Sequence, residues 1–194
     1  PGKHRWDSSE HAPDDKRRID PDNELYPPFH DMQMIVDGEA AKSLAELSRE
    51  RWQKATGEQL APPSANQDDI WPEDIKVDFR QVNIAIARTL PEFKGNREIT
   101  EVELLYLDAI AAAQTLIYIE NQYFTSWKVA EVLAQRLKEE SGPEVVIICP
   151  SMTGGWLEQH TMDVLRSRIC RKLCEADKHD RLLICYPHHE ALGN

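Results

Sequence analysis

Short apolar runs alternate with amphipathic stretches along the second half of the chain. The runs predict strands over residues 115–121, 144–149 and 181–186, and the amphipathic stretches predict helices over 127–140 and 156–177. Strands that alternate with helices in this way imply parallel pairing within one sheet. The pattern therefore predicts an α/β fold in which helices flank a mostly parallel sheet.

The first half of the chain has a weaker pattern. Residues 1–28 are rich in Asp, Pro, Lys and Arg and predict an irregular surface segment, whereas 32–36 predict a strand. A helix is expected over 39–54, followed by a long loop over 55–75 that contains several prolines. The apolar stripe of that helix consists of Ala41, Leu44, Leu47 and Trp52.

The middle of the chain joins these two patterns. Alternating apolar residues predict a half-buried strand over 79–87. Thr100 and Glu103 have the spacing of a capping box, so a helix should begin there and end near Gln114. We expect three parts: residues 1–55, a loop or linker over 56–78, and a βαβαβ region over 79–194.

The charge of the chain narrows the range of partners. The 194 residues carry 34 acidic and 23 basic side chains, which gives a net charge of −11. Binding to a nucleic-acid backbone needs a basic stripe, so the composition argues against a nucleic-acid partner. No run of about eighteen apolar residues is present, so the sequence predicts no membrane-spanning helix.

Three adjacent polar residues follow the apolar run that begins at Leu116. Glu120, Asn121 and Gln122 should emerge at the carboxyl end of a strand, where open α/β sheets bind their ligands. Polar residues at a strand end also cap neighbouring helices and close turns. On composition alone, both interpretations stay open.

The amino-acid sequence of this region resembles that of a known family. Residues 117–124 read Ile-Tyr-Ile-Glu-Asn-Gln-Tyr-Phe and resemble the segment between the two catalytic motifs of phospholipase D enzymes. Residues 2–11, 28–52 and 155–162 resemble further segments of that family, in the family's order. The resemblance implies a two-lobed α/β parent, of which this chain would hold the end of the first lobe (1–55) and the start of the second (79–194).

The family's chemistry rests on two copies of His-x-Lys-x4-Asp, and neither copy is present. None of the seven histidines is followed by a lysine two positions later. These histidines are His4, His11, His30, His160, His179, His188 and His189. We therefore expect an interior piece of a longer phospholipase D that is inactive by itself.

The resemblance assigns roles to particular residues. Asp31 matches the aspartate that supports the nucleophilic histidine, whose ring such a carboxylate orients and whose cation it stabilises. The alternative is that Asp31 caps a loop, while His30 beside it has a structural role. The resemblance also implies that Arg5, Trp6, Asp7 and His11 border the site.

The wall of the substrate pocket would be formed by residues of the second lobe. Glu120, Asn121, Gln122 and Trp156 are expected to line it, the two amides more closely than Glu120. The alternatives are that the polar trio joins the two lobes and that Trp156, like Tyr123, Phe124 and Trp127, packs in a core.

Two further patterns in the sequence could form sites. Cys170 and Cys174 are four residues apart with His179 nearby, which permits a metal site, although core packing is favoured because a second ligand pair is lacking. Cys149 and Cys185 are expected to be buried small hydrophobes. Amides of the loop 151–155 could bind an anion, but its spacing matches no nucleotide motif.

The implied reaction is hydrolysis or transfer of a phospholipid head group through a phosphohistidine, without an obligatory metal or other cofactor. The expected partners are a phospholipid at a membrane surface and the rest of the parent chain. One alternative is a catalytically inactive relative that binds lipid or protein. Another is a phosphodiesterase of the same superfamily that acts on a different substrate.

Overall fold

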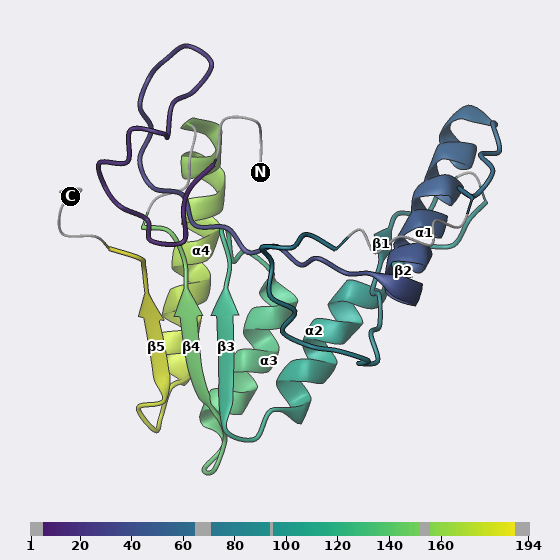
Figure 1. The fold of residues 1–194 in the computed structure, drawn as a ribbon. Helices are drawn as coiled ribbons and strands as arrows, with labels where there is room; N and C mark the ends of the chain where they lie inside the picture. Colours follow the sequence, from purple (N-terminus) through teal and green to yellow (C-terminus); the bar gives the residue numbers. More distant parts are fainter. Residues whose placement is uncertain (1–5, 65–70, 94, 152–155, 189–194) are drawn as a thin grey trace. The chain divides into compact units, whose positions relative to one another are not determined.

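The chain forms a mixed α/β structure. The computed structural model describes residues 6–64, 71–93, 95–151 and 156–188, with only the backbone for 156–160. Its contacts divide the chain into two compact units, Pro1–Ile86 and Ala87–Asn194. The described residues form four helices and a three-stranded parallel sheet (Figure 1), so the predicted α/β class is confirmed at this level.

The first unit contains one helix among its described residues, α1 (Gly38–Thr56), where a helix was expected over 39–54. It ends because Gly57 adopts a left-handed conformation with a φ of 79°, and the Gly57 amide donates to the Gln53 carbonyl. None of the α1 residues is buried, and the side chain of Trp52 is 46% exposed. The apolar stripe of the helix is therefore largely solvent-facing in this structure.

Two expected strands are absent from the described part of the first unit. Residues 32–36 form no strand, and Met32 and Met34 are highly exposed. Residues 79–87 form no strand either, although Val82 and Ile84 do alternate in the sequence. An apolar pattern gives a strand only where a second segment pairs with its backbone, and neither stretch has such a partner in the described chain. The loop expected after α1 is confirmed for its described residues.

The second unit begins with β1 (Thr89–Leu90) and β2 (Ile99–Thr100), which pair antiparallel and lead into α2 (Glu101–Ala112). The helix is confirmed, but the expected capping box is wrong, because the Thr100 side chain makes no capping bond. Glu101 instead accepts hydrogen bonds from the backbone and guanidinium of Arg88, and Glu103 pairs with Lys128 at 2.7 Å.

A parallel sheet forms the centre of the second unit. The strand order is β3-β4-β5, and both neighbouring pairs are parallel. Helices α3 and α4 make the connections between successive strands (Figure 1). The elements are β3 (Leu116–Glu120), α3 (Trp127–Lys138), β4 (Glu144–Ile148), α4 (Trp156–Ala176) and β5 (Leu182–Cys185).

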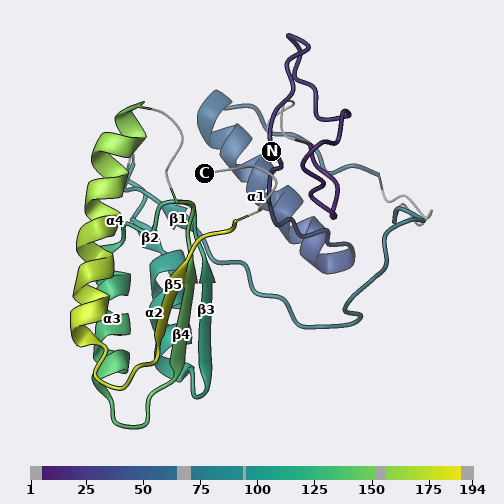
Figure 2. The ribbon, with the colours of Figure 1, turned by 90° about the vertical axis from the view of Figure 1, so that its left-hand side faces the viewer.

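One face of this sheet is covered and contains the core. Figure 2 shows α3 and α4 on the same side of the sheet, and the strand register directs Ile117, Val145 and Ile147 towards them. Leu133 of α3 and Leu173 of α4 are fully buried against this face. Alternate residues of the strands and the apolar sides of the two helices thus pack together in one apolar layer.

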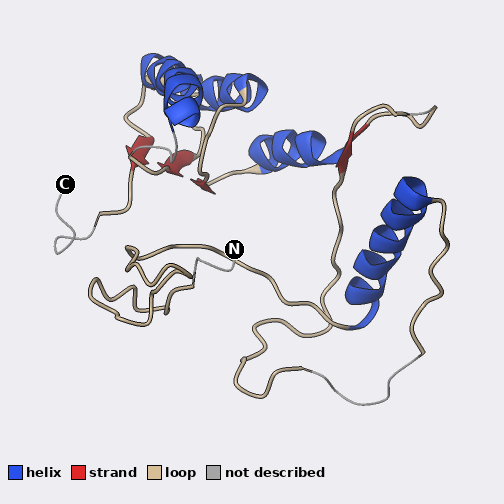
Figure 3. Ribbon diagram, turned by 90° about the horizontal axis from the view of Figure 1, so that it is seen from above, coloured by secondary structure: helices blue, strands red, loops and turns tan. Residues whose placement is uncertain are grey.

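The opposite face, which we call the open face, is covered by no helix of the second unit (Figures 2 and 3). Leu116, Tyr118 and Leu183 are each more than half exposed there. The residues of the open face are Leu116, Tyr118, Glu120, Glu144, Val146, Ile148, Leu183 and Cys185.

Candidate functional site

Glu120 is the last residue of β3 and lies at the carboxyl edge of the sheet, as expected from the sequence. Its side chain is exposed on the open face, and its Oε1 accepts a hydrogen bond of 2.5 Å from the Tyr118 hydroxyl. This bond, together with partial burial, raises the pKa of Tyr118. The phenol therefore stays protonated and remains a donor to the carboxylate.

Asn121 closes the turn that follows β3. Its side-chain Oδ1 accepts hydrogen bonds from the backbone amides of Tyr123 at 3.0 Å and Phe124 at 2.7 Å. The backbone amide of Asn121 donates to the Ile148 carbonyl. Phe124 is buried and takes a φ of 47°, a left-handed conformation that these bonds help to hold. The side-chain carbonyl thus has a structural role in the turn.

The remaining residues of this turn lead to the start of α3. Gln122 is exposed in the turn, and Ser126 caps α3 by accepting from the Val129 amide. The carboxyl edge therefore presents a carboxylate and two side-chain amides in consecutive positions. Such a group can accept from a lysine or a water and donate to a phosphoryl oxygen.

The end of β4 is fastened to the sheet and to α4. The Cys149 amide donates to the Cys185 carbonyl, and the Arg166 guanidinium donates to the carbonyls of Pro150 at 2.8 Å and Ser151 at 3.1 Å. Trp156 is the first residue of α4, but its side chain lies outside the described residues. The anion site expected at 151–155 also falls outside them, apart from Ser151.

The aromatic residues near this edge have different surroundings. Phe124 belongs to the core, as the packing alternative predicted. Trp127 is 50% exposed, which contradicts core packing for this residue. Its ring lies 4.6 Å from the Lys172 ammonium, and its indole N–H donates to Glu131. Trp127 therefore connects α3 with α4 at the surface through a cation–π contact.

Asp31 lies in the first unit, in a segment without regular structure. The side chain is exposed, and Oδ1 accepts from the amide of Met32 at 2.9 Å. This local bond is of the kind that the loop-capping alternative predicts, and it engages one carboxylate oxygen. His30 beside it makes an edge-to-face contact with His11, with ring centroids 5.6 Å apart.

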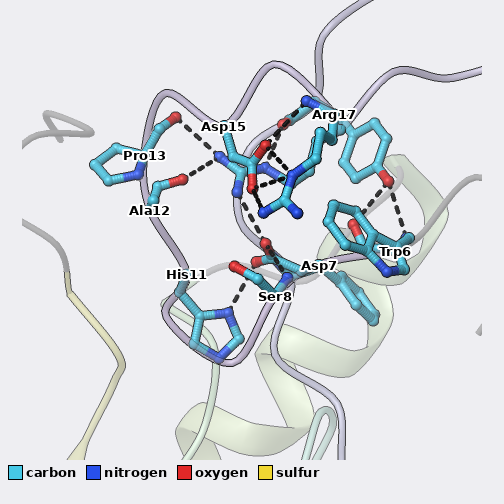
Figure 4. A network of polar contacts seen from close by, with 11 residues as sticks. Trp6, Asp7, Ser8, His11, Ala12, Pro13, Asp15 and Arg17 are labelled. Carbon is cyan, nitrogen blue, oxygen red and sulfur yellow. Dashed lines mark hydrogen bonds and ion pairs between the residues drawn. The ribbon is translucent and has the colours of Figure 1, made fainter.

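A buried ion pair in the first unit was not predicted from the sequence. The Asp7 and Arg18 side chains are 3% and 1% exposed, and Arg18 Nη1 donates to Asp7 Oδ1 at 2.8 Å (Figure 4). Burial raises the pKa of Asp7, but hydrogen bonds from His11, Phe29, Arg18 and Ser8 outweigh it and hold that pKa well below its usual range. The resemblance placed Asp7 and His11 beside the site, but no pattern in the sequence indicated their hydrogen bonds or the burial of Arg18.

The cysteines do not form a metal site in the described part of the chain. No group of three or more His, Cys, Asp or Glu side chains there is arranged to hold a metal ion. Cys149 is buried as predicted, and burial raises the pKa of its thiol. Cys185 is only half-buried, on the open face, and Cys174 is exposed, so the predictions of burial for Cys185 and of core packing for Cys174 are wrong. None of the described helices is long and apolar enough to cross a membrane.

Comparison with models of protein families, with curated proteins and with solved structures finds no match for this chain. The candidate residues fall into two groups, Asp31 in the first unit and the consecutive residues 120–122 in the second. Arguments about function therefore rest on the sequence and on the geometry within each unit.

Proposed function

We propose that this chain is part of a phospholipase D-type phosphodiesterase that hydrolyses or transfers the head group of a phospholipid at a membrane surface. The observation that carries this proposal is the carboxyl end of β3. The segment 117–124, which resembles the family most closely, includes β3, and its polar residues lie at the edge of a parallel sheet where α/β folds bind ligands. In the proposed parent, the two units belong to the two lobes of a phospholipase D-like fold.

The proposed reaction has two steps. A histidine nitrogen attacks phosphorus, the bond from phosphorus to the head-group oxygen breaks, and a second histidine protonates the departing alcohol. Water or another alcohol then gives up its proton and attacks the phosphohistidine, which releases phosphatidic acid or a new phospholipid. Both histidines belong to His-x-Lys-x4-Asp motifs that the 194 residues do not contain.

This chain contributes groups that surround the reaction. Asp31 accepts the ring N–H of the nucleophilic histidine and stabilises the positive charge that develops on it. Asn121 and Gln122 donate to phosphoryl oxygens through their side-chain nitrogens, and Glu120 holds a lysine or a water. Trp156 contributes an apolar surface to the pocket.

The test is an Asp31→Asn substitution in a longer protein that carries both histidine motifs. Turnover of a phosphatidylcholine substrate should fall by roughly tenfold or more, because the amide cannot stabilise the histidine cation as the carboxylate does. Asp14→Asn, a change of another exposed aspartate in the same unit, serves as the matched control and should leave turnover unchanged. Equal turnover in both variants would remove the role of Asp31.

The 194-residue chain by itself should release no choline from phosphatidylcholine vesicles. Release that disappears when one of its own histidines is replaced would contradict the need for the two motifs. A longer protein that binds vesicles without turnover would favour the inactive lipid-binding relative instead.

A further inference from the structure

We propose that Asp7 is a positioning residue that fixes the segment Phe29–Asp31 and so determines where the Asp31 carboxylate lies. The inference rests on the proposed function, since it concerns a residue that acts through Asp31. It starts from the buried ion pair of the first unit (Figure 4), whose Asp7 was expected from the resemblance only to border the site.

The Asp7 carboxylate makes four hydrogen bonds, two on each oxygen. Oδ1 accepts from the Ser8 amide and from Arg18, and Oδ2 accepts from the His11 ring and from the Phe29 amide, all at 2.8 Å. An ionised carboxylate has about four acceptor positions, so its capacity is filled. Asp7 is therefore joined to a residue 22 positions along the chain by a short, partly buried and charge-assisted bond.

Arg18 holds the Asp7 carboxylate in place from the other side. Its guanidinium also donates to the carbonyls of Ala12, Pro13 and Tyr26, at 2.5, 2.9 and 3.2 Å. Burying a charged pair is favourable only where the remaining donors and acceptors are satisfied, and these bonds meet that condition. The pair thereby fixes the turn at residues 12–13 and the segment that leads to Asp31.

Tyr26 adds a second connection between the same segments. Its hydroxyl donates to the Trp6 carbonyl at 2.7 Å and accepts from the Trp6 amide at 2.9 Å. Beyond Phe29 the chain is exposed at His30 and Asp31 and has no regular structure until α1. The bond from the Phe29 amide to Asp7 therefore fixes the backbone in a partly buried position only two residues before Asp31.

His11 extends the network to the neighbouring histidine. A carboxylate oxygen can only accept, so the bond to Asp7 requires the proton on His11 Nδ1. The ring then stands edge-to-face against His30, the residue that precedes Asp31. Asp7 thus positions the segment before Asp31 in two ways. It binds the backbone amide of Phe29, and it orients the His11 ring that contacts His30.

The first test measures amide hydrogen exchange by NMR in the 194-residue chain. Asp7→Asn replaces two acceptor positions by an N–H₂ group, so the Phe29 amide should exchange roughly tenfold to a hundredfold faster. The α1 amides of the same unit, Ala45 and Leu47, should keep their rates. Asp15→Asn is the matched control, because Asp15 lies in the same loop but its carboxylate accepts from the amide and guanidinium of Arg17 rather than from Phe29.

An unchanged Phe29 rate, or equal acceleration at Phe29, Ala45 and Leu47, would overturn the proposal. If Asp7→Asn does not fold, the unaltered chain still gives an answer. Among the described residues, His11 and Arg18 are hydrogen-bonded to the Asp7 carboxylate and the positive charge of Arg17 also acts on it, so this carboxylate should stay ionised at pH 4. Protection of the Phe29 amide should therefore persist there after correction for intrinsic exchange, and its loss would contradict the proposal.

The second test uses the longer protein with both histidine motifs. Asp7→Asn should lower kcat by roughly tenfold with little change in KM, because misplacement of Asp31 affects the reacting histidine rather than lipid binding. A loosened Phe29 amide with unchanged kcat would overturn the positioning role. Absence of turnover in the unaltered protein would overturn the proposed function instead, and the exchange result would stand independently of it.

Discussion

Asn121 and Asp177 use their side chains in the same way, to satisfy backbone amides next to a strand. Asp177 follows α4, and its carboxylate accepts from the amides of Arg181 at 3.1 Å and Leu182 at 3.1 Å, just before β5. The sequence predicted that polar residues lie at the end of β3, and they do. It could not predict that Asn121 uses its carbonyl in the turn, or that Arg18 is buried, because both depend on contacts between distant residues.

Asp177 gives a prediction about acid stability. Burial raises its pKa, but the amide hydrogen bonds outweigh burial and lower that pKa below the usual value. A carboxyl group with a lowered folded-state pKa stabilises the fold above its unfolded-state pKa, and this contribution disappears as pH falls through the folded-state value. Asp177→Asn should therefore lower the urea midpoint at pH 7 and make its fall below about pH 4 shallower. A midpoint equal to that of the unaltered chain at both pH values would contradict this.

The elements of the parallel sheet and the helices beside it were predictable from the sequence, whereas the short paired strands β1 and β2 were not predicted. The strands β3, β4 and β5 and the helices α2, α3 and α4 were each expected within a few residues of their observed bounds. The strands expected over 32–36 and 79–87 are wrong, because their apolar pattern has no pairing segment in the described chain. A strand forms backbone hydrogen bonds only with a second segment, whereas a helix such as α1 forms them within its own backbone.

Substitution of a buried and of an exposed leucine would test how the helices pack in the second unit. Leu133 of α3 is fully buried, whereas Leu104 of α2 is 55% exposed. Leu133→Ala should lower the free energy of unfolding by about 2–5 kcal/mol, because it removes contacts and leaves a cavity. Leu104→Ala should change it by no more than about 0.5 kcal/mol. Urea denaturation followed by circular dichroism would measure both, and similar losses would contradict the assigned burial.

At the scale of the whole molecule, the parallel sheet is covered on one face only within its unit. Purely parallel sheets are normally buried on both faces, so the open face is unusual. It carries Leu116, Tyr118 and Leu183 together with two glutamates. The sequence indicated continuous apolar strands, which is the pattern of a sheet with two covered faces.

The open face should bind a probe of apolar surface. We expect the 194-residue chain to increase the fluorescence of anilinonaphthalene sulfonate, and Leu183→Gln should reduce that increase by roughly half. Met34→Gln is the control, since Met34 is 82% exposed in a segment without regular structure. An equal reduction in both variants would show that the probe does not select the sheet.

The strand order also has a consequence for how the chain folds during synthesis. β4 is the central strand, so β3 has no partner until the ribosome has made both α3 and β4. Pairing of this kind is slow, because a long loop must close before any contact is gained. Until then the run Leu116–Ile119 is an uncharged apolar segment with free strand edges, which favours aggregation of the nascent chain. Hydrophobic attraction weakens on cooling, so expression at low temperature should reduce this aggregation and increase the yield of folded protein.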